Sequence, residues 1–175
     1  MCFLQKYKRF LFSPPVNVAL RGIATQSSNY YNYYASFAID GNRLTGQGVF
    51  LCTHTNADNN PWWRVNLLAM YDISNVIITN RGDAFPERLN GAEIHIGNSL
   101  INNGNNNPRC VVISSISAGA SVNYTFQYAR GVIPCNFKRA FLRIKFNSND
   151  DLSNPAVKDK VLQKVCLCAN VHSVV

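Results

Sequence analysis

The stretch Trp62-Trp63-Arg64-Val65-Asn66-Leu67-Leu68 decides the fold class of this chain. Large apolar residues alternate there with polar ones, which is typical of a strand that is buried on one face. A second run, Ile73-Ser74-Asn75-Val76-Ile77-Ile78-Thr79-Asn80, follows closely and is rich in β-branched side chains. Both runs are therefore expected to be strands of a buried sheet.

The rest of the chain carries strand signals of the same kind. They lie at residues 16–21, 92–97, 110–113, 121–128, 140–146 and 161–171, while residues 25–34 and 102–108 are polar and predict loops. About eight short strands separated by turn signals predict an all-β sandwich, with helix only in short turns. Gly41, in Asp40-Gly41-Asn42, is expected to take a positive φ.

Composition indicates one globular domain. The chain has 175 residues, of which 47% are hydrophobic and 15% are charged, and its net charge is +8. The basic residues cluster only at residues 6–9 and 158–164, without the interleaved aromatic residues that nucleic-acid binding favours. No stretch approaches the roughly 20 apolar residues of a membrane span. Residues 16–172 are predicted to form the domain, preceded by an irregular extension at residues 1–15.

The cysteines indicate an oxidising compartment. Their spacing does not fit a zinc site, so disulfide bonds explain them better. Cys110 and Cys135 flank a predicted hairpin that a disulfide bond could staple. Cys52 is expected to pair with Cys166 or Cys168, which leaves Cys2 and one of these last two cysteines unpaired. The sequon Asn123-Tyr124-Thr125 agrees with secretion. Residues 1–15 have charges in their middle and no signal-type apolar run. Either the signal is missing from this chain, or the protein is secreted as part of a longer one, or it is not secreted; the cysteines favour a truncated or mispredicted start.

Three cationic or imidazole side chains stand at fixed intervals around the first strand pair. His54 is followed after 26 residues by Arg81-Gly82-Asp83, and Arg88 follows Asp83 after four more. Taken singly, each of these residues is more often an ordinary surface or loop residue. The joint spacing indicates a site for hydroxyl and ether oxygens, which accept well from charged donors.

This spacing, together with other short motifs, closely resembles the F-type lectins, a family of fucose-binding lectins also called fucolectins. The other motifs are Asn17-Val18-Ala19-Leu20-Arg21-Gly22, Ala38-Ile39-Asp40-Gly41-Asn42, Cys52-Thr53-His54-Thr55, Pro61-Trp62-Trp63-Arg64-Val65 and Ile78-Thr79-Asn80-Arg81-Gly82-Asp83. The resemblance covers about residues 16–171. It implies a jelly-roll β-sandwich of the galactose-binding, discoidin-like type, with a sugar bound between loops at one end.

The resemblance also implies the role of each site residue. His54, Arg81 and Arg88 would donate hydrogen bonds to the 4-hydroxyl, the ring oxygen and the 3-hydroxyl of α-L-fucose, and Asp83 would orient the arginines. Family members often place two adjacent, linked cysteines after the Arg-Gly-Asp sequence, where this chain has Ala84-Phe85. Phe85 is expected to supply the apolar wall for the 5-methyl group instead.

A structural calcium ion is the cofactor that the resemblance implies. Its ligands would be the carboxylate of Asp40 and backbone oxygens of Phe37, Asn42, Leu51 and Cys168. Leu51 and Ala169 stand where the family has a serine and a glutamate, and calcium prefers six to eight oxygens. Calcium binding is therefore expected to be weak or absent unless another residue, such as Asp58, contributes.

The leading hypothesis is a secreted, non-enzymatic lectin for terminal fucose that acts in innate recognition or adhesion. Some relatives form trimers, and a homo-oligomer of this kind would raise the avidity for glycans. The alternative is a degenerate lectin-like sandwich that serves protein or membrane-surface adhesion without sugar. An enzyme is disfavoured because no pair of acidic residues and no nucleophile motif stands out. The Arg81-Gly82-Asp83 triplet also spells an adhesion motif, but the lectin spacing explains it better.

Overall fold

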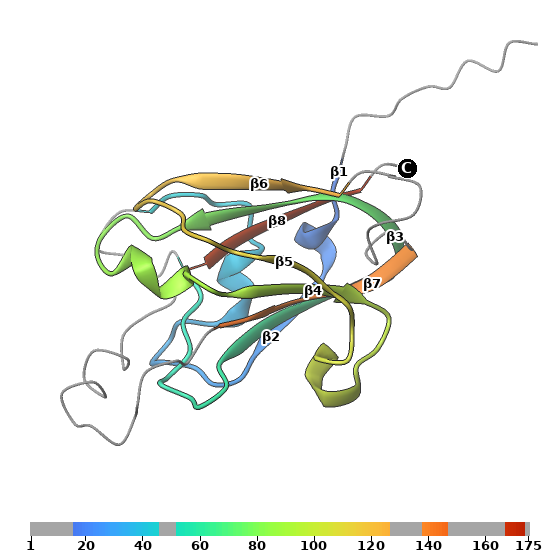
Figure 1. Ribbon diagram of the computed structural model, residues 1–175, viewed down its shortest axis with the longest axis horizontal. Helices are drawn as coiled ribbons and strands as arrows, with labels where there is room; N and C mark the ends of the chain where they lie inside the picture. Colours follow the sequence, from blue (N-terminus) through green and yellow to red (C-terminus); the bar gives the residue numbers. More distant parts are fainter. Residues whose placement is uncertain (1–15, 46–51, 127–137, 147–166, 174–175) are drawn as a thin grey trace, which may run out of the picture.

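The computed structural model describes residues 16–45, 52–126, 138–146 and 167–173 (Figure 1). Its strands are β1 (Val16–Asn17), β2 (Ile23–Gln26), β3 (Trp62–Asn80), β4 (Glu93–Gly97), β5 (Arg109–Val112), β6 (Ser121–Thr125), β7 (Lys138–Lys145) and β8 (Leu167–Ser173). The helical elements are four single turns of 3-10 type: η1 (Val18–Arg21), η2 (Ala35–Ala38), η3 (Pro86–Leu89) and η4 (Ile101–Gly104). The prediction of an all-β chain with short helical turns is confirmed.

β3 belongs to both layers of the sandwich. Its first half pairs with β2 and β7, whereas its second half pairs with β6 and β8, all antiparallel. Leu68, at the bend between the halves, has a φ of 65°, and its N–H donates to Asn66 Oδ1 at 2.9 Å. Figure 1 shows the bend at the right and both halves running back toward the left. The two strands predicted from residues 62–68 and 73–80 are thus one bent strand.

The core lies between the two layers. One layer contains β2, the first half of β3, β7, β4 and β5, and the other contains β1, β8, the second half of β3 and β6. Alternate residues face inward, as the period-2 pattern requires. The fully buried apolar side chains include Trp63, Val65, Val76, Ile78, Ile94, Ile96, Leu142 and Ile144. Trp63 Nε1 also donates to the Ala35 carbonyl at 2.9 Å, which ties η2 to the core.

The predicted first strand over residues 16–21 is wrong beyond Asn17. The Asn17 side chain accepts a hydrogen bond from the Ala19 N–H at 3.2 Å and so caps the turn η1. The Gly22 N–H closes the turn by donating to the Ala19 carbonyl at 2.9 Å. The strand that follows, β2, extends into the segment predicted as a loop, because Thr25 and Gln26 pair with β3.

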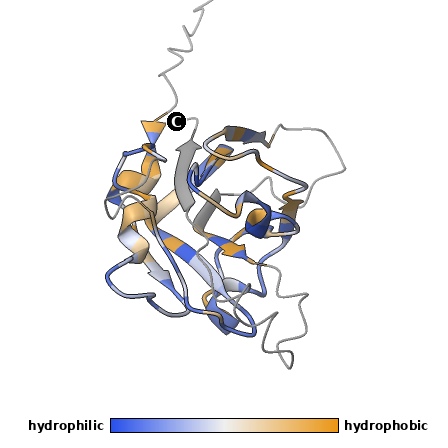
Figure 2. Cartoon of the chain, turned by 90° about the vertical axis from the view of Figure 1, so that its left-hand side faces the viewer, coloured by the Kyte–Doolittle hydropathy of each residue, from blue (hydrophilic) through white to orange (hydrophobic). Residues whose placement is uncertain are grey.

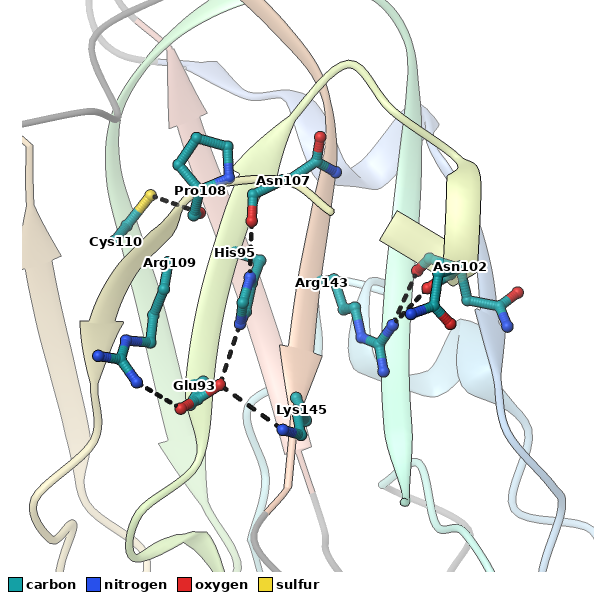
Figure 3. A network of polar contacts seen from close by, with 10 residues as sticks. Glu93, His95, Asn102, Asn107, Pro108, Arg109, Cys110, Arg143 and Lys145 are labelled. Atoms are coloured by element: carbon teal, nitrogen blue, oxygen red, sulfur yellow. Dashed lines mark hydrogen bonds and ion pairs between the residues drawn. The ribbon is translucent and has the colours of Figure 1, made fainter. Parts of the chain in front are cut away.

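A polar network fastens the outer surface of the larger layer (Figure 3). The Glu93 carboxylate on β4 accepts a hydrogen bond from Arg109 on β5 at 2.7 Å, and it lies 3.1 Å from His95 Nε2 and 3.9 Å from Lys145 Nζ on β7. The hydrogen bond from Arg109 lowers the pKa of Glu93, and His95 and Lys145 add to this effect against the opposing effect of burial. The network joins three neighbouring strands.

The polar segment predicted as a loop at residues 102–108 overlaps η4, which begins one residue earlier at Ile101. Asn102 and Asn103 both have positive φ, a conformation that asparagine tolerates better than most residues. Arg143 Nη1 on β7 donates to the Asn102 carbonyl at 2.9 Å and holds this turn against the sheet (Figure 3). The Arg143 guanidinium also lies 5.4 Å from the Trp62 ring, so Trp62 contributes to the half-buried face of the sheet.

Cys52 and Cys110 each take part in a disulfide bond. Their predicted partners Cys135 and Cys166 lie outside the described residues, as does the extension at residues 1–15, and the side chain of Cys168 is not described. The pairing therefore stays a prediction. None of the helices in the described ranges has the length and apolar character needed to cross a membrane.

Candidate functional site

His54 is held in the loop that precedes β3. Its ring is buried and stacks on Tyr30, with 4.2 Å between ring centroids and an interplanar angle of 20°. Nδ1 lies 2.5 Å from the Thr55 carbonyl, which can only accept, so Nδ1 is the protonated nitrogen of this contact. The His54 carbonyl accepts from the Tyr30 N–H at 3.0 Å and from Gln26 Nε2 at 2.9 Å. The imidazole orientation is thus fixed by neighbours on both sides.

Arg81 and Asp83 form a bidentate pair where β3 ends. Arg81 is buried, its Nε donates to Asp83 Oδ1 at 2.6 Å, and its Nη2 donates to Asp83 Oδ2 at 2.5 Å. Burial alone would raise the pKa of Asp83, but the hydrogen bonds and the positive charge of Arg81 outweigh it and lower that pKa. Asp83 therefore stays charged and fixes the plane of the guanidinium.

Phe85 and Arg88 lie beside this pair. Phe85 has a φ of 53° at the start of η3, a left-handed conformation that costs about 1 to 3 kcal/mol in a bulky residue. The residue is 43% exposed, and the centroid of its ring lies 4.1 Å from the Arg88 guanidinium carbon. Burial and the charge of Arg81 lower the pKa of Arg88 to about 10, so Arg88 remains protonated at neutral pH. Arg88 therefore lies over an exposed aromatic residue and close enough to Arg81 to feel its charge.

Asn80 is a positioning residue that the sequence did not reveal. Its side chain is buried, and Nδ2 donates to the Pro86 carbonyl at 2.9 Å and to the Ile116 carbonyl at 2.7 Å. Its Oδ1 accepts from the Arg81 N–H at 2.9 Å. Asn80 thus closes the loop of residues 81–86 on itself and ties it to a second segment. An asparagine at the end of a buried strand was the available signal.

Gly82 is required by a close approach of the backbone. A Cβ at this position would lie 2.9 Å from the Thr45 carbonyl oxygen, to which the Gly82 N–H donates at 3.0 Å. No side chain fits there without displacing Thr45. Gly82, the middle residue of the Arg81-Gly82-Asp83 triplet, therefore packs against the segment that contains Thr45.

The site residues predicted from spacing fall at one end of the sandwich. Arg81, Asp83, Phe85 and Arg88 form one cluster of contacts. His54 belongs to the loop before β3, and the bend of β3 brings both ends of that strand to the same end of the molecule. Figure 2 faces this end and shows many hydrophilic loop residues there. The cluster offers charged donors and an apolar surface, which suits a polar ligand with an apolar edge.

The side chains of the candidate calcium ligands Asp40 and Asn42 form hydrogen bonds within their own turn. Asp40 Oδ1 accepts from the Asn42 N–H at 2.7 Å, Asn42 Oδ1 accepts from the Leu44 N–H at 2.9 Å, and Gly41 has the expected positive φ of 85°. Asp58 accepts from the hydroxyls of Ser27 and Ser28. The described residues contain no group of three or more histidine, cysteine or acidic side chains placed to hold a metal.

The turn at Asp40 supplies few side-chain oxygens for a calcium ion. Asp40 is the one carboxylate of the set, whereas calcium prefers six to eight oxygens. Leu51 lies outside the described residues, so the position of its carbonyl relative to those of Phe37 and Asn42 is not described. Calcium binding at this turn therefore stays a prediction.

Comparison with known proteins identifies the family of this chain. A family model described as NedA-like, galactose-binding domain matches residues 37–132. The chain is 50% identical over 113 residues to Fucolectin of Anguilla anguilla, covering 62% of this chain and 72% of that protein. It belongs to the fucolectin, or F-type lectin, family. Fucolectin-4 of Anguilla japonica is 55% identical over 108 residues, covering 59% of this chain and 60% of that protein.

Fucolectin structure agrees with the fold. The crystal structure of an F-lectin from striped bass (Morone saxatilis) serum matches with a TM-score of 0.77 and 41% identity, and covers 92% of this chain. The chain spans half of that protein and 60% of the length of Fucolectin-4. The galactose-binding type of β-sandwich is confirmed. The relatives are named as lectins rather than enzymes, as predicted from the sequence.

Replacing Asn80 with alanine should destabilise the fold by about 1 to 3 kcal/mol, because buried groups at Pro86, Ile116 and Arg81 lose their hydrogen-bond partner. Urea denaturation followed by tryptophan fluorescence measures this change. Asn90→Ala, at an exposed asparagine after η3, is the matched control and should leave the midpoint unchanged. Equal midpoints for both variants would show that Asn80 does not hold the loop.

Proposed function

We propose that this chain is a carbohydrate-binding module that recognises terminal α-L-fucose through His54, Arg81 and Arg88. The observation that supports it most strongly is the bidentate Arg81–Asp83 pair beside the Arg88 guanidinium, at the strand end where the spacing predicted a sugar site. The names of the fucolectin relatives support the same class of ligand.

The proposed chemistry follows from the donor types. A guanidinium holds five N–H groups in one rigid plane, so the grip of Asp83 sets the direction of every donor on Arg81. Sugar hydroxyls and the ring oxygen accept from such charged donors, with bonds about twice as strong as neutral ones. Arg88 keeps its charge at neutral pH because its lowered pKa, about 10, is still well above 7.

Phe85 would form the apolar part of the site. Its backbone is in the left-handed conformation just before η3, and the Arg88 guanidinium lies over the ring. The exposed ring offers a flat apolar surface to the 5-methyl group of fucose, which a purely polar loop would not provide. We propose that this aromatic wall replaces the linked cysteine pair that many family members carry after Arg-Gly-Asp.

We further propose that the protein acts outside the cell, in recognition or adhesion. Disulfide bonds at Cys52 and Cys110 persist in oxidising compartments, and the striped bass relative comes from serum. A shallow site with few donors binds one sugar weakly, so assembly of several copies, such as a trimer, would raise the avidity for glycan surfaces.

A fucose column tests the proposal. The protein should be retained and eluted by free fucose, whereas His54→Ala and Arg81→Lys should each weaken binding about 10- to 150-fold, as expected for a lost hydrogen bond to a charged or fixed donor worth about 1.5 to 3 kcal/mol. Arg81→Lys keeps the positive charge beside Asp83 while removing the planar fork, so the fold should survive.

Arg21→Ala, at an exposed arginine of η1, is the control and should bind as the original protein does. Circular dichroism shows whether each variant is folded. Folded His54→Ala and Arg81→Lys with undiminished retention would place the site elsewhere. A folded original protein that is not retained would favour the alternative, a sandwich for adhesion without sugar.

Calcium should contribute little to the stability of this chain. We propose that any site near Asp40 is weak, because one carboxylate and turn-forming side chains supply too few oxygens. At a calcium concentration equal to the dissociation constant, the stabilisation is only about 0.4 kcal/mol. Thermal melts at low millimolar calcium and with chelator should therefore nearly coincide; a large rise of the midpoint with calcium would reveal a complete site.

A further inference from the structure

The chain contains one N-x-Ser/Thr sequon, Asn123-Tyr124-Thr125, and the structure places it in β6. Asn123 and Thr125 are exposed, whereas Val122 and Tyr124 pack against the core from the other face of the strand. Because side chains alternate across a strand, the asparagine and the threonine of the sequon share the outer face. Both residues that define the modification signal are therefore open to solvent.

A neighbouring strand orients the Asn123 amide. Asn75 on β3 donates from Nδ2 to Asn123 Oδ1 at 3.0 Å. The oxygen of the amide is thus turned toward β3, and the nitrogen points to the other side of the planar group. Among the described contacts, none uses Asn123 Nδ2. That nitrogen is the atom that N-glycosylation modifies, and the bond from Asn75 survives its substitution.

The edge position of β6 gives a glycan there a physical role. Among the described strands, β6 pairs only with β3, and it forms the upper margin of the sandwich in Figure 1. An unpaired strand edge is a template for association with another chain, and bulky or polar groups on it prevent this. A glycan on Asn123 would cover this margin.

We propose that Asn123 carries an N-linked glycan. In the transfer, Asn123 Nδ2 bonds to C1 of the first sugar of a lipid-pyrophosphate-linked oligosaccharide. The bond between C1 and the pyrophosphate oxygen breaks, the amide loses one proton, and the lipid pyrophosphate leaves. The proposal requires passage through the secretory pathway, which the disulfide-bonded Cys52 and Cys110 favour.

The glycan would leave the candidate sugar site open. Asn123 pairs with Ile77 on β3. Ile77 lies three residues before the last residue of β3, Asn80, so Asn123 stands about 10 Å from the strand end that leads into the loop with Arg81. It also stands on the outer face of its layer rather than at the loop end. Loss of the glycan is therefore expected to leave retention on fucose unchanged.

Secretion of the full chain from cultured animal cells, behind a supplied leader peptide, tests the proposal. Peptide N-glycosidase should raise the gel mobility of the secreted protein. In heavy-oxygen water, it should convert Asn123 to labelled aspartate in the peptide mass spectrum. Asn123→Gln and Thr125→Ala should lack the modification, and Thr125→Ser, which preserves the sequon, should keep it.

Two results would overturn the proposal: a secreted original protein whose Asn123 peptide is unmodified, or a glycan that persists in Thr125→Ala. The original protein supplies the first result by itself, so the test holds even if a variant is not secreted. The fucose column, run with Asn123→Gln, separates this inference from the proposed function, since either can fail while the other stands.

Discussion

The bend of β3 at Leu68 is the constraint on which the rest of the structure depends. A positive φ at this residue and a hydrogen bond from its N–H to Asn66 turn one strand from the first layer into the second. The two layers are therefore covalently continuous through their longest strand. Both ends of β3 then emerge at the same end of the sandwich, where the loop with His54 precedes the strand and the loop with Arg81 follows it.

Two carboxylates oppose the repulsion between the cations at that end. Burial and the charge of Arg81 lower the pKa of Arg88, whereas Glu87 and Asp83 counteract this effect, and Asp83 also accepts two hydrogen bonds from Arg81. The result is a cluster of charged donors whose directions are set before any ligand arrives. Preorganised donors lose little freedom on binding, which favours recognition of a small polar sugar by few contacts.

The sequence predicted the parts of this arrangement that follow from pattern and spacing. Alternation revealed β4, β5 and β6, and the interval from His54 to Arg81 indicated the family and its site. It did not show that residues 62–80 are one strand, because a bend with positive φ at Leu68 leaves no periodic signal. The role of Asn80 was also hidden, since its three partners lie in segments that only folding brings together.

The conformation of Phe85 is a further point that local pattern did not reveal, because phenylalanine seldom adopts left-handed backbone. Its place beside Arg88 links the polar and apolar halves of the candidate site. A crystal structure with methyl α-L-fucoside tests it most directly. We expect a sugar held by His54, Arg81 and Arg88 with its methyl group on Phe85; a sugar bound elsewhere on the sandwich would contradict the proposed site.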